Sequence, residues 1–522
     1  MVSGSVVSGS IGSGKRLLIL LTALVFAQAA WAFDYSDVVE RARERAASAW
    51  SAPKPVPDFL RNLDYSEFQA IRFRPEASLW RDSASPFQVM LMSPGSYYGH
   101  AVRLNVVDGD RVSTVSFDKS VFDYAGPELA KRIPADLGYA GFKLTFPLHD
   151  KDTANQFLVF GGASYFRGVG RDNRFGLSAR GLAVDTGLPS GEEVPAFTDF
   201  WLEKPAAGSE SMRVYALLDG PRVTGAYRFD IQPGAATEVR VKAELFFRDD
   251  IQQPGIAPLT SMFYYGENTP RPVGEWRPQV HDSDGLLLHD SHSGEWLWRP
   301  LLNPANLRLS YFSVTGLGGF GLLQRDTGFD RFEDAEARYD QRPSAWVRTE
   351  GDWGPGHVVL VEIPTRGETN DNIVAFWKPQ GEVRGGEQRT FEYTLTFGNP
   401  AIAGEPLAYA RNTFVGLGDR VGGGNVAGAI RLIVDFAGGP LEGLAADAPV
   451  VSQVTGLEDT EVIEHFVEYL PASDSWRLSI LARPQGEKVL ALRGFLSQDG
   501  RALTETWNYE LPHGSDLRRE TE

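Results

Sequence analysis

The chain has 522 residues, with 51 lysines and arginines against 68 aspartates and glutamates, and it contains no cysteine. The formal net charge of −17 repels polynucleotides and anionic lipids, so nucleic-acid partners are not expected. The lack of cysteine excludes disulfides, thiolate metal sites and a cysteine nucleophile.

Residues 1–32 are predicted to form a signal peptide of the Sec type. Lys15 and Arg16 precede an apolar run over residues 17–27, and Ala30 and Ala32 supply the small residues of a cleavage site. The run is too short for a bilayer core of about 30 Å, and no later stretch reaches about 18 apolar residues. We therefore expect export to the periplasm without stable membrane insertion, with a retained N-terminal anchor as the alternative.

The start of the mature chain predicts one helix, after which the hydrophobic period changes to two. Ser36 is a candidate N-cap, and Val39, Ala42 and Ala46 recur at helical spacing. Later segments alternate apolar with polar residues, most clearly over residues 238–247. Many short strands joined by glycine-rich turns predict an all-β fold built from sandwiches.

The strand pattern divides into two parts near residue 400. Residues 33–400 are predicted to form one large β-sandwich. Residues 401–515 contain five or more short strands, as in a sandwich of immunoglobulin size. Residues 516–522 form a charged tail that we expect to be frayed.

Carboxylates are the most promising groups for chemistry. The sequence has no serine-hydrolase, phosphate-loop or dinucleotide motif, and His289 and His292 lack the partners of a zinc site, so neither a metal nor a cofactor is expected. Two acidic loops, residues 281–285 and 367–372, stand beside apolar strands, where sites are often built. Each loop alone is also explained as a turn in which Asp or Asn side chains bond local backbone amides.

Longer segments of the chain resemble the signature blocks of a known family. These segments are GGASYFR at 161–167, GLSARGLA at 176–183, GIAPLTSMF at 255–263, RPQVHDSDG at 277–285, GEW at 294–296, GFGLLQ at 319–324 and RPSAW at 342–346. They are similar to blocks of the bacterial periplasmic glucan biosynthesis proteins G and D, and the similarity runs from about Phe33 to Leu511. Because Lys15-Arg16 is not the twin-arginine signal that the resemblance implies for D-type members, the G type is favoured.

The resemblance implies a large galactose-mutarotase-like β-sandwich followed by an immunoglobulin-like β-sandwich. It also implies a role in making osmoregulated periplasmic glucans, whose backbone is β-1,2-linked glucose. Family members are inverting hydrolases of β-1,2-glucan, and this is the activity that we expect. Two alternatives stay open: a binding factor that receives glucan from a membrane glucosyltransferase without turnover, and a transglycosylase that branches or cyclises the chain.

The resemblance also implies roles for individual residues. Asp371 resembles the general acid of the family, Asp282 its general base, and Tyr339 a tyrosine of the catalytic cleft. Inverting hydrolysis uses two carboxyl groups about 6.5–9.5 Å apart, one protonated and one ionised. We expect Asp371 to be kept protonated by burial or by a neighbouring acid such as Glu368.

Further substrate-binding candidates lie in or beside the same blocks. They are Tyr165, Arg167, Arg180, Asp284, Trp296, Arg299, Trp346 and Glu368. An aromatic ring can cover the apolar face of a pyranose, and polar groups can bind its hydroxyls. An arginine and tryptophan pair in a sandwich is, however, at least as often structural packing.

Overall fold

The computed structural model describes residues 33–124, 126–419, 424–515 and 517. Strands make up 46% of the chain and helices 10%, which confirms the predicted all-β sandwich architecture. The predicted signal peptide and most of the predicted charged tail lie outside the described residues. Within the described part of the chain, no helix is long and apolar enough to cross a membrane.

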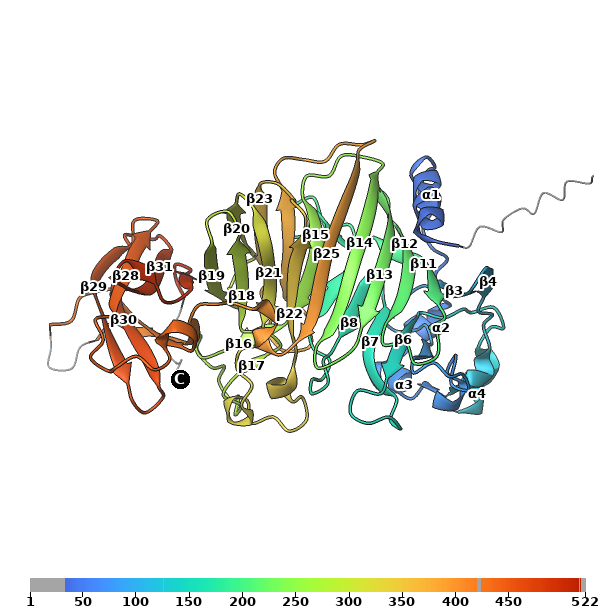
Figure 1. The fold of residues 1–522 in the computed structure, drawn as a ribbon, viewed down its shortest axis with the longest axis horizontal. Helices are drawn as coiled ribbons and strands as arrows, with labels where there is room; N and C mark the ends of the chain where they lie inside the picture. The colour runs from blue at the N-terminus through green and yellow to red at the C-terminus, as the bar shows by residue number, and fades with distance from the viewer. Residues whose placement is uncertain (1–32, 125, 420–423, 516, 518–522) are drawn as a thin grey trace, which may run out of the picture.

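Two large, mainly antiparallel sheets face each other in the main body of the molecule (Figure 1). The first has, in spatial order, β2 (Gln88–Met92), β6 (Gly141–Phe146), β7 (Asn155–Gly161), β8 (Tyr165–Gly168), β9 (Ser178–Arg180), β15 (Pro254–Ser261), β24 (Ile373–Pro379), β23 (Gly356–Glu362) and β20 (Arg308–Val314), with β10 (Leu182–Val184) beside β15. The second has β19 (Glu295–Pro300), β18 (Gly285–Asp290), β21 (Leu317–Leu323), β22 (Ser344–Glu350), β25 (Gln388–Gly398), β14 (Thr237–Phe247), β13 (Val223–Gln232), β12 (Met212–Asp219), β11 (Ala196–Glu203), β3 (Arg103–Asp108) and β4 (Arg111–Thr114).

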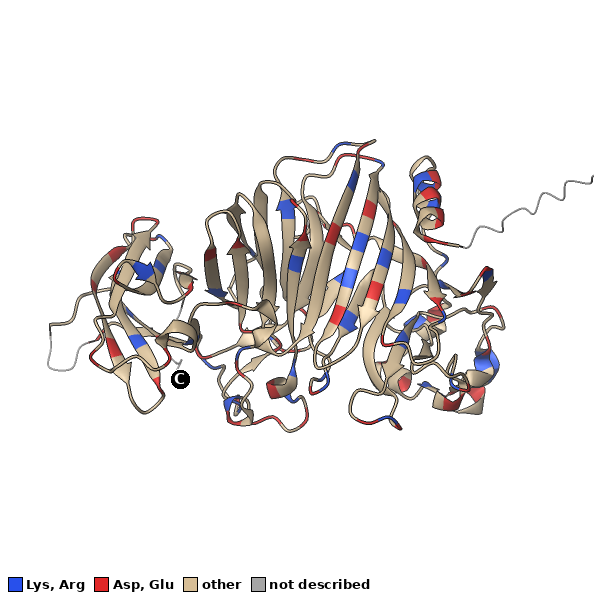
Figure 2. Ribbon diagram, viewed as in Figure 1, with Lys and Arg blue, Asp and Glu red and all other residues tan. Residues whose placement is uncertain are grey.

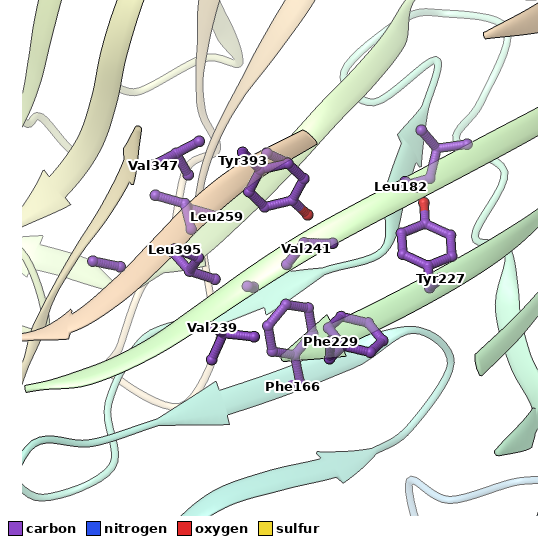
Figure 3. Close-up of a cluster of buried hydrophobic side chains, with 14 of the residues drawn as sticks. Phe166, Leu182, Tyr227, Phe229, Val239, Val241, Leu259, Val347, Tyr393 and Leu395 are labelled. Carbon is purple, nitrogen blue, oxygen red and sulfur yellow. The ribbon is translucent and has the colours of Figure 1, made fainter. Parts of the chain in front are cut away.

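The main core fills the space between these sheets. The alternation predicted over residues 238–247 is present in β14, where Val239, Val241 and Leu245 are buried and the intervening residues are more exposed. Phe166 of the first sheet packs against Phe229 of the second, with ring centroids 5.4 Å apart. Figure 3 shows these side chains pointing toward one another from the two sheets.

The outer face of the second sheet is charged and partly covered by helix α1 (Tyr35–Ala46). Figure 2 shows acidic and basic positions alternating along β13, β14 and β25. The predicted helix is present, but Asp34 caps it in a capping box with Asp37, while the Ser36 amide donates to the Asp34 carboxylate. Its buried face carries Val38 and Ala42.

A smaller sandwich follows the main body and lies at one end of the long axis (Figure 1). One of its sheets contains β26 (Tyr409–Leu417), β27 (Ile430–Ala437), β30 (Ser475–Arg483) and β29 (Glu461–Leu470). Its other sheet contains β28 (Val451–Leu457), β31 (Leu490–Gln498), β32 (Arg501–Ala502) and β33 (Thr506–Leu511). Because β33 pairs in parallel with β19, this second sheet continues the large sheet of the main body.

Short elements complete the fold. Helices α2 (Asp58–Arg61), α3 (Tyr65–Gln69) and α4 (Pro127–Arg132) gather with β1 (Arg72–Phe73) and β5 (Phe122–Asp123) at the end opposite the small sandwich (Figure 1). The small pair β16 (Phe263–Tyr265) and β17 (Val280–His281) lies at an edge of the main body and leads directly into the first acidic loop.

Candidate functional site

One backbone segment, residues 261–263, anchors both acidic loops. On one side the amide of Asp282 donates to the Met262 carbonyl at 2.8 Å, and the hydroxyls of Ser261 and Ser283 lie 2.8 Å apart. On the other side Asn372 is buried and exchanges two side-chain hydrogen bonds with the Phe263 backbone, at 2.8 and 3.0 Å. This shared anchor holds two loops together that lie far apart along the chain.

Asn372 and Ser261 hold the two acidic loops in place, and they were not singled out from the sequence. Asn372 is adjacent to Asp371 in the acidic loop, and its amide also donates to the Ile363 carbonyl at 3.0 Å. A buried side chain with this many backbone partners fixes the path of its loop. The signal available in the sequence was weak, because an asparagine in a polar loop usually indicates only a turn.

Asp282 has a buried carboxyl group. The residue is 8% exposed, and its Oδ1 lies 3.3 Å from the Arg342 Nε without a well-directed hydrogen bond. Burial raises the pKa of Asp282 to about 6; the positive charge of Arg342 opposes this shift, and the negative charge of Asp371 adds to it. A carboxyl group with such a pKa exchanges protons near neutral pH.

Asp371 lies directly before β24 and is more open to solvent. Its side chain is 34% exposed, and its Oδ2 lies 3.6 Å from the Arg167 Nη2. The Nε of Arg167 donates to the Ser178 hydroxyl at 2.7 Å, which holds the guanidinium on the first sheet. The expected burial of Asp371 is therefore not found: Asn372 points into the protein, and the adjacent Asp371 is partly exposed. The buried acid of the pair is Asp282.

Tyr339 and Glu368 form one hydrogen-bonded unit beside the two aspartates. The Tyr339 hydroxyl donates to the Glu368 Oε2 at 2.6 Å, and the Arg277 Nη1 donates to the same oxygen at 2.6 Å. Burial, together with the hydrogen bond and charge of Glu368, raises the pKa of the Tyr339 hydroxyl. The Arg342 guanidinium lies over the Tyr339 ring at 5.4 Å, so Arg342 links this unit to Asp282.

Tyr165 and Arg180 form the adjoining wall. The Arg180 guanidinium lies 4.8 Å from the centroid of the Tyr165 ring, and Arg180 is fixed by Glu192 at 2.6 Å and by the Thr260 hydroxyl at 2.9 Å. Burial raises the pKa of Tyr165, and the negative charge of Asp371 adds to this shift. The structure thus brings Tyr165 and Arg180 to the same cluster as Asp371.

The structure buries three other candidates, two of them in a second core at the junction of the two sandwiches. Trp296 stacks on Trp346 with centroids 5.6 Å apart, and both rings are buried. Arg299 is fully buried and pairs with Glu362 at 3.4 Å. These buried side chains present no face to a sugar. The two tryptophans point toward the small sandwich, whereas Arg299 points from the other face of β19 toward Glu362 on β23.

Asp284 also turns away from the Asp282 carboxyl group. Its Oδ2 accepts the backbone amides of Arg325 at 2.8 Å and Asp326 at 3.2 Å, so the side chain fastens its loop to the end of β21. Burial raises its pKa to about 7, and the negative charge of Asp326 adds to this shift. Asp284, Trp296, Arg299 and Trp346 therefore lie outside the candidate site.

The histidines do not form a metal centre with neighbouring acids. Among the residues that the structure describes, no group of three or more His, Asp or Glu side chains is arranged to hold a metal ion. His289 instead stacks on Trp296 with centroids 4.3 Å apart. The described chemistry of the site is that of carboxyl, phenol and guanidinium groups.

Comparison with known proteins decides the family. The family model described as "Periplasmic glucan biosynthesis protein, MdoG" matches residues 33–511. The chain belongs to the MdoG family. A relative named "Glucans biosynthesis protein G", from Ralstonia nicotianae, is 43% identical over 504 residues, which cover 96% of this chain and 100% of the relative. Membership in this family indicates a periplasmic protein that takes part in the synthesis of osmoregulated periplasmic glucans.

A solved structure of a protein from Synechocystis sp. PCC 6803 shares 8% identity with this MdoG-family chain. The match covers 50% of this chain and 92% of the Synechocystis chain, with a TM-score of 0.24.

Proposed function

We propose that this MdoG-family protein hydrolyses β-1,2-linked glucan with inversion, using Asp371 as general acid and Asp282 as general base. The observation that carries the proposal is the common anchor of the two acidic loops on residues 261–263, which brings a buried and an exposed carboxyl group within electrostatic reach. A pair of carboxyl groups in unlike environments suits an acid and base pair.

Asp282 has the properties of the base. Its pKa of about 6 leaves most of the group ionised at neutral pH, and its Oδ1 has no hydrogen-bond partner within the described chain. The Asp282 side chain is 11% exposed, and its carboxylate can accept a proton from the attacking water. In the same step the C1–O bond to the leaving sugar breaks, a new C1–O bond to water forms, and Asp371 gives its proton to the leaving oxygen.

The neighbouring residues position these groups. Arg167 holds the Asp371 carboxyl group from the first sheet, where this exposed side chain can meet a bound glucan chain. Tyr339 is oriented by its hydrogen bond to Glu368, and its hydroxyl oxygen can still accept a hydrogen bond from water or from a sugar hydroxyl.

The test uses linear β-1,2-glucan and three variants. Asp371→Asn and Asp282→Asn should each lower the release of reducing sugars by about 10²–10⁴-fold, as expected for the loss of a general acid or base. Asp136→Asn is the matched control, because Asp136 is exposed outside the cluster and its loss should leave the rate unchanged. Undiminished hydrolysis by either cluster variant would reject its assignment, and wild-type protein that binds glucan without turnover would favour the binding-factor alternative.

Product analysis separates hydrolysis from transfer. Inverting hydrolysis transfers the sugar of a β-linked chain to water and reverses the configuration at its anomeric carbon. NMR of the first products should therefore show new reducing ends of the α anomer. New linkages or rings without reducing ends would instead support a transglycosylase.

A further inference from the structure

A pocket of about 260 Å³ lies beside the Asp371 cluster and takes no part in the proposed acid and base chemistry. It is formed between the loop that follows β2 and the turn that joins β7 to β8. Tyr97 lines this pocket, and 88% of its surface is exposed.

The backbone around the pocket is adapted to its shape. Ser96 has φ of 49° and Ala163 has φ of 44°, both in the left-handed region that costs energy for residues other than glycine. At Gly161 a Cβ atom would lie 3.0 Å from the terminal methyl group of Met92 and 3.3 Å from the Tyr98 ring. A glycine at this position lets the Tyr98 ring lie close against the turn.

The pocket is continuous with the Asp371 cluster. Tyr165 lines the pocket and lies two residues before Arg167 on β8, so their side chains share one face of the strand. The charge of Asp371 contributes to the raised pKa of Tyr165, and the charge of Arg167 acts on the phenol of Tyr98. The charges of Asp371 and Arg167 therefore both act on tyrosines that line the pocket.

The lining selects an uncharged ligand. It contains three tyrosines, a phenylalanine and a histidine, and none of the described residues that line it is a lysine, arginine, aspartate or glutamate. Burial lowers the pKa of His100, which favours its neutral form. Aromatic rings that also carry hydroxyl groups suit a ligand with apolar faces and a hydroxylated edge.

We propose that this pocket, lined by Tyr97, Tyr98 and Tyr165, is a distal subsite that holds a glucosyl unit of the same chain whose cleavage occurs at Asp282 and Asp371. The proposal rests on the proposed function, because it takes the ligand of the cluster to be β-1,2-glucan. It assigns the pocket to binding alone, so that only chains long enough to reach it gain affinity.

The experiment measures glucan binding by calorimetry in the Asp371→Asn background, with a series of linear β-1,2-glucans from short to long. Adding Tyr97→Ala should weaken binding of the long chains by about three- to tenfold, the effect of losing one aromatic contact, and should leave the shortest bound chains unaffected. Tyr65→Ala is the matched control, because Tyr65 is also highly exposed but does not line the pocket. Tyr98→Phe keeps the ring and removes only the hydroxyl group, so it tests the pocket without removing a packed side chain.

The outcomes separate the two proposals. A length-dependent loss in Tyr97→Ala, absent in Tyr65→Ala, supports the distal subsite. Unchanged affinity for every chain length in both pocket variants, or an equal loss for short and long chains, overturns it while the proposed function stands. If the Asp371→Asn protein binds no β-1,2-glucan of any length, the proposed function fails, and the subsite fails with it.

Discussion

The Asp282 and Asp371 cluster and the junction of the two sandwiches are built from the same kinds of side chain. At the junction Arg325 binds Glu505 at 2.6 and 2.8 Å, pairs with Glu405 at 3.3 Å and lies 3.6 Å from the Trp298 ring. Both regions combine arginines with carboxyl groups whose pKa burial raises. They differ in access, because the junction is sealed by aromatic rings while Asp371 is one-third exposed.

This difference separates an open site at Asp371 from a closed junction held by Arg325. The Arg325 side chain reaches from the main body to the Ala410 carbonyl on β26 and to Glu505 just before β33, so it joins both sheets of the small sandwich to the large one. Because all of its partners lie inside the protein, Arg325 holds the two sandwiches together. Arg167 has one face on solvent beside Asp371 and can still meet a ligand.

The largest predicted change in stability tests this contrast by replacing the buried Arg299 and comparing it with the half-exposed Arg167. Arg299→Met leaves Glu362 as an unpaired buried charge and should lower the free energy of unfolding by about 3–5 kcal/mol. Arg167→Met breaks a half-exposed pair and should cost about 1 kcal/mol or less. Urea denaturation at neutral pH measures both changes.

The double variant Arg299→Met/Glu362→Leu provides the control for that comparison. Replacing both charges with apolar side chains removes the unpaired group and should recover most of the lost stability. If both substitutions lowered the free energy of unfolding equally, burial would not distinguish Arg299 from Arg167. The contrast between the closed and the open region would then not hold.

The same contrast explains what the sequence could predict. Strict alternation over residues 238–247 was sufficient for β14, since one buried face repeats with period two. The sequence also singled out the two acidic loops, because their residue types are unusual beside apolar strands, and the structure brings these loops together. Trp296 and Arg299 were predicted to bind substrate because a sequence block does not show which elements pack against its strand. Here the core of the small sandwich, much later in the chain, packs against Trp296, and Glu362 on β23 pairs with Arg299.

A smaller change, in how stability depends on pH, tests whether burial raises the pKa of the Asp282 carboxyl group. Its pKa is about 6 in the folded protein against an ordinary value of 3.8, so the folded state binds the proton more tightly. The resulting stabilisation is complete below about pH 4 and is lost as the pH rises through 6. Asn does not titrate, so the stability of Asp282→Asn relative to wild type should increase by about 1–3 kcal/mol from pH 4 to pH 8.

Denaturation curves at several pH values measure this difference, and effects of the substitution that do not depend on pH cancel between them. A difference that stays constant from pH 4 to pH 8 would mean that Arg342 fully offsets the burial of Asp282. The carboxyl group would then be ionised well below neutral pH, and the cluster would lose the feature that fits Asp282 to act as a base near neutrality.

The smallest effect is expected at the junction, in Glu405→Gln. Burial raises the pKa of Glu405, and the negative charge of Glu505 adds to the shift, so Glu405 is the protonated member of the two acids around Arg325. Glutamine has the shape of the protonated side chain and can also donate to Glu505, so the free energy of unfolding at pH 7 should change by about 1 kcal/mol or less. A loss of about 3 kcal/mol or more would mean that Arg325 holds two ionised carboxylates, and that the junction depends on a balanced charge network in the same way as the open cluster.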